Sequence, residues 1–491
     1  MKRLPILLAI ILLLTSCWDE SILGVKTSEH EIHYTTSDGK PVYIKDRLFG
    51  GFGHKVVSNT YENGLGIIKF REGVESINSE AFFYSNLVSI TIPECITSIG
   101  DQVFMGCGDL VSVELPESIT EIGTEAFASC TSLKDIVVPS GVSVIKKRTY
   151  SHCTALTSIS IPEGVTAIKA EAFEDCTGLT SVTLPESLTT IEKAPFSGCD
   201  NLATFYGKYA SEDGKYLCDG DTLLAIAPAG LTELTLPEGI ATIGEYALGG
   251  CKQLLSITIP EGVVTIGNGA FSQCEGLTEI SIPKSVTRIG AEAFQMCYWL
   301  TNIAIPEGVT TIEPKTFFNC NSLKSVSIPN SVTTISDNAF SVCPSLSITI
   351  PDSVTKIGQG AFSGCKWLKE ITIPEGVTAL YDLTFHGCER LSAVSLPSTL
   401  TSIGSKTFSS CRVLKEVTIP HSVSTIGDSA FDHCKWLEAV HCTSTTPPTI
   451  SDSTFSECAE GLTIYVPKGC GQNYKSAAGW SSYHGAIVEE E

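Results

Sequence analysis

A unit of 23 residues recurs through most of this chain, and its prolines mark the period. A fixed period in this range is typical of a solenoid, in which each unit contacts only its neighbours. Such a stack presents a long surface rather than an enclosed pocket, which favours binding over catalysis. The prolines stand 23 residues apart in three runs, with one interval of 52 and one of 22 between the runs: Pro93, Pro116, Pro139, Pro162 and Pro185; Pro237, Pro260, Pro283, Pro306 and Pro329; Pro351, Pro374, Pro397 and Pro420.

The aligned units share the consensus C-x-x-L-x-x-I-x-I-P-x-x-V-x-x-I-G-x-x-A-F-x-x, with a clean copy from Cys274 to Gln295. Its segment L-x-x-I-x-I predicts a strand of about five or six residues that stops at proline, because proline has no N–H to donate to a ladder. The period of two places Ile280 and Ile282 inside the coil and their neighbours outside. Units stacked in one direction give a parallel sheet.

The second half of the unit predicts a different backbone. V-x-x-I-G indicates a tight extended segment, and we expect glycines such as Gly123 and Gly267 to supply a positive φ there. The following A-F stretch has helical spacing, which predicts one helical or 3-10 turn on the opposite side of the coil from the strand.

Both ends of a stack need a lid, because an open sheet edge is exposed to other chains. The repeat is absent from 25–70 and 443–491, which we interpret as an N-terminal β cap and a C-terminal cap around an array at 71–442. Within the first cap, 37–40 predicts a hairpin between strands near 32–34 and 42–44. The second predicts a strand at 462–466, a helix near 472–478, and coverage of the last coil by Trp480 and Tyr483.

The interval between Cys199 and Cys251 is 52 residues long, where one repeat would give 23. Asp213-Gly214 and Asp219-Gly220 lie there between short apolar runs, which predicts an inserted hairpin near 203–230. Such an insertion bends the stack, adds a docking feature, or serves as a plain spacer.

The N-terminus has the pattern of an export signal. A charged start, an apolar run too short to span a bilayer and small residues predict a signal peptide at 1–16. Leu14-Thr15-Ser16-Cys17 is similar to a bacterial lipobox, which predicts lipidation of Cys17 and a tether at 17–24. The alternative is an ordinary cleaved signal in which Cys17 is incidental. The acidic pair after Trp18 resembles the export signal of surface lipoproteins, so we expect anchoring in the bacterial outer membrane facing the exterior; a periplasm-facing anchor is the alternative.

Charge limits the partners. The 491 residues include 32 Lys and Arg against 54 Asp and Glu, a net charge of −22. This charge opposes phosphate backbones and anionic lipid headgroups, so we expect no nucleic-acid partner and membrane contact only through the lipid anchor.

These motifs together resemble the BspA-like leucine-rich-repeat surface proteins. The resemblance rests on the repeat consensus, the lipobox, the lead-in Tyr61-Glu62-Asn63-Gly64-Leu65-Gly66-Ile67-Ile68, and Tyr465-Val466-Pro467 followed by Tyr474 and Trp480. It implies an α/β leucine-rich-repeat solenoid, a right-handed superhelix or horseshoe with a parallel β-sheet on the concave face and short helical or 3-10 turns on the convex side. It also implies display on a bacterial surface and, as in some members, adhesion. The family offers no catalytic motif.

The chain has 20 cysteines, and fifteen of them occupy the same position in successive repeats, which we call the cysteine column. In an exported protein they suggest disulfides, and neighbouring coils about 4.8 Å apart are within bridging range. An odd column cannot pair completely, however, and bridging would distort equivalent units unequally. We therefore favour small buried thiols that pack the turn.

Other chemistry has weaker support in the sequence. His433, Cys434, His441 and Cys442 are close together, but their columns alternate between inward and outward, and no H-E-x-x-H or paired C-x-x-C occurs. There is no G-x-S-x-G elbow and no phosphate-loop context. We predict no catalytic residue, no metal site, no cofactor and no enzymatic activity.

The outward strand positions are the best candidate for a ligand surface. Ser and Thr predominate there and Lys and Arg are missing, which also suits a solvated strand that binds nothing. Three tryptophans recur near the strand entrance, where they anchor a protein or glycan or else pack over the edge of a neighbouring coil. We predict a surface that binds a protein or glycan, with a non-adhesive scaffold or accessory lipoprotein of an envelope assembly as the alternative, and predict no particular oligomeric state. The candidate residues are Asp135, Ser158, Ser160, Glu279, Ser281, Asn302, Glu370, Thr372, Trp299, Trp367 and Trp436.

Overall fold

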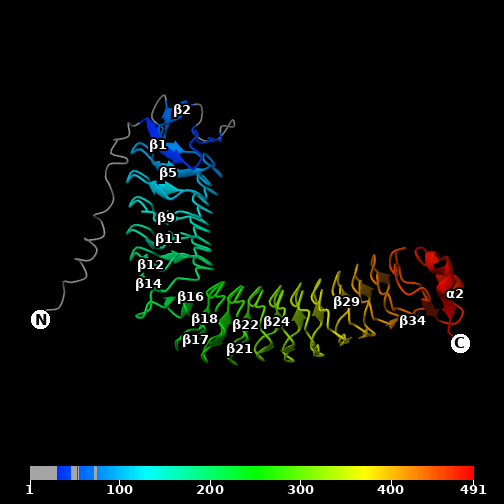
Figure 1. Cartoon of the computed structure of the whole chain (residues 1–491). Helices are drawn as coiled ribbons and strands as arrows, with labels where there is room; N and C mark the ends of the chain where they lie inside the picture. Colours follow the sequence, from blue (N-terminus) through cyan, green and yellow to red (C-terminus); the bar gives the residue numbers. More distant parts are fainter. Residues whose placement is uncertain (1–29, 46–51, 53–54, 71–73, 491) are drawn as a thin grey trace.

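The computed structural model describes residues 30–45, 52, 55–70 and 74–490. Its coils stack into two straight arms that meet at an elbow (Figure 1). Each arm has its own continuous apolar core, one from Ile32 to Ala227 and the other from Leu223 to Ile487. The chain is a leucine-rich-repeat solenoid of stacked parallel coils with very little helix.

Most repeats add a strand to a first ladder, which lies before the marker proline. Neighbouring strands are parallel and in register, so that Ile257 lies beside Ile280. Most have three or four residues, shorter than the expected five or six, and the described chain has no strand at 133–138 or 346–350. The strands are β5 (Leu87–Thr91), β7 (Ser112–Glu114), β10 (Ser158–Ser160), β12 (Ser181–Leu184), β14 (Thr204–Gly207), β17 (Glu233–Thr235), β19 (Ser256–Thr258), β21 (Glu279–Ser281), β23 (Asn302–Ala304), β25 (Ser325–Ser327), β28 (Glu370–Thr372), β30 (Ala393–Ser395), β32 (Glu416–Ile419) and β34 (Ala439–Cys442).

The V-x-x-I segment forms a second parallel ladder that the sequence alone did not predict. Its strands have only two residues, and the second residue of each is apolar and almost always buried. The two halves of the repeat therefore contribute strands to two separate sets of parallel sheets. The strands are β4 (Ser76–Ile77), β6 (Ser98–Ile99), β8 (Glu121–Ile122), β9 (Val144–Ile145), β11 (Ala167–Ile168), β13 (Thr190–Ile191), β18 (Thr242–Ile243), β20 (Thr265–Ile266), β22 (Arg288–Ile289), β24 (Thr311–Ile312), β26 (Thr334–Ile335), β27 (Lys356–Ile357), β29 (Ala379–Leu380), β31 (Ser402–Ile403) and β33 (Thr425–Ile426).

The A-F stretch forms consecutive hydrogen-bonded turns and no helix in the described repeats. In one coil the N–H of Ala128 donates to the carbonyl oxygen of Glu125, and that of Cys130 donates to Phe127. Glu125 and Ser129 take positive φ values of 56° and 59°. A helix requires successive right-handed residues, so these two left-handed residues prevent one.

The glycine after V-x-x-I is required for close packing between coils, and not for the positive φ that we expected. Gly123 and Gly267 do not have a positive φ; instead a Cβ on Gly123 would lie 2.3 Å from the carbonyl carbon of Gly100 in the preceding coil. The close approach of two backbones therefore selects glycine here. The prediction of a left-handed glycine at this position was wrong.

The phenylalanine of the repeat forms a stack along each arm. In the second arm, the rings from Phe271 to Phe455 are nearly parallel to their neighbours and stacked on them, with centroids 5.2–5.5 Å apart. In the first arm Tyr150 replaces one phenylalanine and is fully buried between Phe127 and Phe173. These rings fill the coil beneath the turns and make each coil depend on its neighbours.

The N-terminal lid is antiparallel. Strand β1 (Glu31–Thr36) pairs with β3 (Leu65–Phe70) on one side and with β5 on the other, and β3 pairs with β2 (Val56–Glu62) across the Asn63-Gly64 turn. The expected hairpin at 37–40 is not present, because 41–45 forms no strand and the partners of β1 come from later in the chain. Asn63-Gly64 lies between the two paired strands, the typical sequence of a tight hairpin turn.

The elbow lies at the long interval between Cys199 and Cys251. On the turn side the two arms are continuous, because the Ser197 hydroxyl donates to the carbonyl oxygen of Gly249 at 3.0 Å. On the strand side β14 and β17 belong to separate sheets, and an antiparallel hairpin of β15 (Tyr216–Asp219) and β16 (Thr222–Ile226) lies between the arms. Strand β16 then pairs with β18 and starts the second arm's ladder. Coils that touch on one side and are separated on the other form a bend.

The C-terminal end carries β35 (Thr463–Val466), helix α2 (Gly471–Ser476), the 3-10 segment η2 (Trp480–Ala486) and β36 (Ile487–Glu489). Trp480 is fully buried, lies 6.1 Å from the Phe455 ring, and donates its indole N–H to the carbonyl oxygen of Pro448 at 2.7 Å. Tyr483 packs edge-on against Phe455 and donates to the carbonyl oxygen of Asp452. The last ring of the stack is therefore covered.

Candidate binding surface

The outward residues of the first ladder lie on one exposed face. Ser158 and Ser160 are on β10, Glu279 and Ser281 are on β21, and Asn302 is on β23, with Ile159, Ile280 and Ile303 buried between them. Glu370 and Thr372 occupy the same positions on β28. Asp135 is exposed in a coil that has no strand, so it does not extend the hydrogen-bonded row.

This face is shallow. Near the middle of the second arm, an open hollow is lined by Ser347, Thr349, Trp367, Lys369 and Thr372, among others. Its lining includes small hydroxyl side chains together with Glu370. On strands nearer the elbow, the Ser325 hydroxyl donates to the amide oxygen of Asn302 at 2.7 Å. The surface offers many hydrogen-bonding groups spread over several coils and no deep apolar pocket.

The three tryptophans are exposed. The exposed fraction is 63% for Trp299 and 55% for both Trp367 and Trp436. The guanidinium carbon of Arg390 lies 3.9 Å from the centre of the Trp367 ring, and the ammonium of Lys415 lies 5.8 Å from that of Trp436. Each of these two rings is thus beside a cation of the next or the preceding coil, with much of its surface left open.

The sequence argument missed the basic residues beside these tryptophans. In the coils that begin at Cys365, Cys388, Cys411 and Cys434, the first, second and fourth positions after the cysteine include six exposed cations. A comparison of these columns between the two arms would have found them, because the coils of the first arm have only one cation there, Lys134. We name the six the basic edge: Lys366, Lys369, Arg390, Arg412, Lys415 and Lys435.

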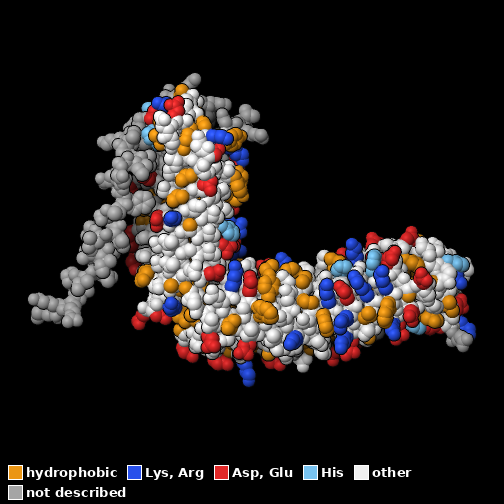
Figure 2. Space-filling model, in the orientation of Figure 1, with side chains coloured by type: hydrophobic (Ala, Val, Ile, Leu, Met, Phe, Trp, Pro, Cys, Tyr) orange, Lys and Arg blue, Asp and Glu red, His pale blue; other side chains and the backbone are white. Residues whose placement is uncertain are grey.

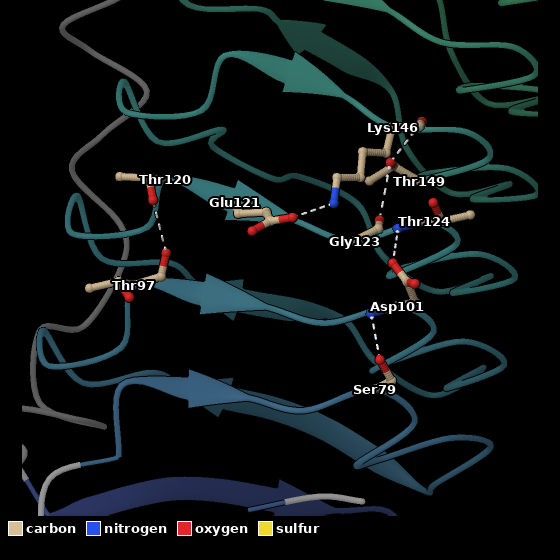
Figure 3. A network of polar contacts seen from close by, with 9 residues as sticks. All are labelled: Ser79, Thr97, Asp101, Thr120, Glu121, Gly123, Thr124, Lys146 and Thr149. Carbon is tan, nitrogen blue, oxygen red and sulfur yellow. Dashed lines mark hydrogen bonds and ion pairs between the residues drawn. The ribbon is translucent and has the colours of Figure 1, made fainter.

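Polar side chains elsewhere connect coil to coil. Figure 3 shows Asp101 accepting a bond from the backbone N–H of Thr124 at 2.7 Å, while its own N–H donates to the hydroxyl of Ser79. Thr149 donates to the carbonyl oxygen of Lys146, whose ammonium forms an ion pair with Glu121. Each group in this network binds a neighbour in the stack, so the network stabilises the array.

The cysteine column consists of free thiols. The fifteen cysteines of the column form no disulfides with one another, as the argument from the odd column favoured. Typical members are fully buried and donate to the carbonyl oxygen of the phenylalanine in the preceding coil, as Cys388 does to Phe362. Burial raises the pKa of Cys388 to about 12 and that of Cys107 to about 11. Such thiols stay protonated near neutral pH and are poor nucleophiles.

The His and Cys residues near the C-terminus do not converge. Cys434 donates to the carbonyl oxygen of Phe408, whereas His441 stacks on Tyr465 and contacts the carboxylate of Glu490. In the part of the chain that the structure describes, no group of three His, Cys, Asp or Glu side chains is arranged to hold a metal ion.

The predicted lipidation site Cys17 lies outside the described residues. Between residues 30 and 490, the described segments include no apolar helix of membrane-spanning length.

Stacked parallel coils with two ladders, an aromatic stack and a lid at each end define a leucine-rich-repeat solenoid. The model of the BspA type Leucine rich repeat region matches residues 75–204, 227–347 and 345–461, which is most of the chain. The chain belongs to this family, and the resemblance stated from its motifs is confirmed.

Solved structures of bacterial leucine-rich-repeat proteins are similar along almost their whole length. One from Eubacterium ventriosum has 21% identity and a TM-score of 0.50, with 83% of this chain and 99% of that chain covered. One from Bacteroides ovatus has 22% identity and a TM-score of 0.44, covering 89% and 99%. A leucine rich cell surface protein from Faecalibacterium prausnitzii has 23% identity and a TM-score of 0.41, covering 75% and 93%. No curated protein matches the chain.

Proposed function

We propose that this protein is a lipid-anchored, outward-facing binding protein that recognises a protein or glycan through its extended solenoid surface. The observation that carries the proposal is the exposed first-ladder face with its row of small polar side chains and three exposed tryptophans. Contacts that are individually weak add together when they repeat along a rigid array or across neighbouring molecules.

The arrangement of titratable groups favours binding over catalysis. Burial raises the pKa of column thiols such as Cys107 and Cys388 and keeps them protonated, and several carboxylates whose pKa is lowered are bound to a neighbouring coil. Glu117, for example, accepts bonds from the hydroxyl and backbone N–H of Ser140, which lower its pKa. These groups hold the stack together and leave the exposed face to make contacts.

Anchoring and orientation are part of the proposal and rest on the sequence. Residues 1–16 are proposed as a signal peptide, Cys17 as the lipidated residue, and 17–24 as the tether. Several acyl chains on one residue give durable anchoring, so Cys17→Ala should release the chain from the membrane fraction. Full retention of that variant in the membrane would contradict the anchor.

An array displaying glycans and extracellular-matrix proteins tests the binding function. The full chain should bind at least one class of probe, and Trp367→Ala should weaken that binding while leaving the thermal unfolding midpoint unchanged. A chain that binds nothing on the array but recovers envelope proteins from detergent extracts would support the alternative, a scaffold of an envelope assembly.

A further inference from the structure

The basic edge concentrates six exposed cations on four adjacent coils of an acidic protein. Across its four coils, the first, second and fourth positions after each cysteine number twelve residues, of which six are Lys or Arg and two, Glu389 and Glu438, are acidic. The corresponding positions of the five coils of the first arm carry Lys134 alone as a cation. Figure 2 shows Lys and Arg gathered on the viewed face of the second arm, whereas Asp and Glu line its lower edge.

These cations have few counter-ions. Lys366 forms an ion pair with Glu389 at 3.3 Å, and it is the only member of the basic edge with a carboxylate within 4 Å among the described residues. The others are exposed, and Arg390 and Lys415 are oriented over the tryptophan rings. The Debye length in physiological salt is about 8 Å, so the local field depends on the charges nearby, which include the six cations and the carboxylates of Glu370, Glu389, Glu416 and Glu438 in the same coils.

The spacing fits an extended, repetitive anion. The coils that carry the basic edge repeat at 5.3–5.5 Å, measured between the stacked rings of Phe362, Phe385, Phe408 and Phe431. Trp367 lies at one end of the edge and Trp436 at the other, three coils apart. A ligand that follows the stack therefore meets an open aromatic face, then a row of cations, then a second aromatic face.

The chemistry of the surrounding surface identifies the ligand class. The flat faces of the sugar rings of a ligand would pack on the tryptophans, and its carboxylate or sulfate groups would bind Lys and Arg. Its hydroxyl groups would form hydrogen bonds with the Ser and Thr side chains beside Trp367 and Lys369. A protein partner normally needs a well-packed pocket for a hot-spot anchor, and this hollow is open and shallow. An acidic sugar polymer meets all three requirements at once.

We infer that the basic edge with Trp367 and Trp436 binds a linear acidic polysaccharide that carries carboxylate or sulfate groups. This inference rests on the proposed binding function and assigns it a surface and a ligand class. The polymer runs along the second arm, with its sugar rings on the tryptophans and its acidic groups on Arg390, Lys415 and their neighbours.

The test uses the purified full chain with three immobilised probes: heparin as the sulfated polymer, polygalacturonic acid as the carboxylated one, and dextran as the neutral control. Binding to at least one acidic polymer should exceed binding to dextran and should weaken as salt is raised, because counterions compete for the cations. The acidic probe that binds distinguishes sulfate from carboxylate recognition.

Two variants locate the site. The double variant Arg390→Ala/Lys415→Ala should weaken binding about tenfold or more and flatten its salt dependence. Trp367→Ala/Trp436→Ala should also weaken binding but keep the salt dependence. The matched control is Lys134→Ala, which removes an exposed cation from the same column of the first arm and should leave binding unchanged.

The outcomes separate this inference from the broader function. Equal binding to dextran, or unchanged binding in both double variants, would overturn the inference. If the acidic polymers fail while another array probe binds, the binding function stands and this ligand class is wrong. If no probe of any class binds, the binding function fails with it.

Discussion

The thiol of Cys130 donates a hydrogen bond to the carbonyl oxygen of Phe104 in the preceding coil, at 3.1 Å. The same relationship repeats from Cys107 to Cys199 and from Cys274 to Cys458, so within each arm successive turns are joined through sulfur. Alkylation in denaturant without reductant should therefore modify all fifteen cysteines of the column, whereas the native protein should react slowly. Mass spectrometry measures both; unmodified cysteine pairs after denaturation would show disulfides instead.

The buried thiols should make stability fall in alkaline solution. In the unfolded chain they ionise near their ordinary pKa of 9.0, whereas burial raises the pKa of Cys388 to about 12. The folded state then holds more protons than the unfolded state above pH 9, so the stabilisation is complete below that pH and is lost as pH rises toward 12. Each such thiol contributes a slope of about 1.4 kcal/mol per pH unit.

Urea unfolding on either side of pH 9 measures this slope. Cys388→Ala should be less stable than the original protein at neutral pH. Above pH 9, however, its free energy of unfolding should fall less steeply with pH, by the contribution of one thiol. An unchanged slope in that variant would mean that Cys388 ionises freely in the folded state.

Tyr150 should be replaceable with a gain in stability. It is fully buried in the aromatic stack, 5.6 Å from the Phe127 ring and 5.4 Å from Phe173, and its hydroxyl has no hydrogen-bond partner among the described residues. Burial of an unsatisfied hydroxyl costs about 1–3 kcal/mol, so Tyr150→Phe should raise the free energy of unfolding by about 1 kcal/mol or more. Chemical denaturation measures this value, and a loss of stability would contradict the described environment.

Gly123 should not tolerate a side chain. Because a Cβ there would lie 2.3 Å from the carbonyl carbon of Gly100, Gly123→Ala must push two coils apart and should cost about 1–3 kcal/mol. Gly461→Ala is the control, since nothing lies within 4 Å of the Cβ it adds. If both variants unfold at the same denaturant concentration, close approach does not select Gly123.

Trp480 and Trp367 should differ in their effect on stability. Trp480 is fully buried over the end of the aromatic stack, so Trp480→Ala should destabilise the protein by about 3–5 kcal/mol. Trp367 is more than half exposed, and its removal should change stability by about 0.5 kcal/mol or less. Thermal unfolding of the two variants side by side makes the comparison, and equal losses would contradict the assigned roles.

The sequence predicted the stacking because period and alternation depend on local residues. Ile280 had to face inward beside Glu279 and Ser281 whatever the neighbouring coils did. The second ladder at β20 and β22, the elbow, and the reason for Gly123 depend on distances between coils, which one repeat does not contain. The hairpin at 37–40 failed for the same reason, since β1 finds both partners in later segments.

The candidate surface was predicted in part. Trp299, Trp367 and Trp436 were recognised because each stands two residues after a cysteine of the column, near the strand entrance. The basic edge was missed because each of its cations is ordinary by itself, and the concentration becomes visible only when three columns of adjacent coils are placed on one face.

Protease treatment of intact cells that produce the protein tests the central claim most directly, because it asks whether the binding surface faces outward. The account predicts that the full-length protein disappears from intact cells while a periplasmic marker survives. Survival of the protein until the outer membrane is permeabilised would contradict outward display and place the chain in a periplasm-facing assembly.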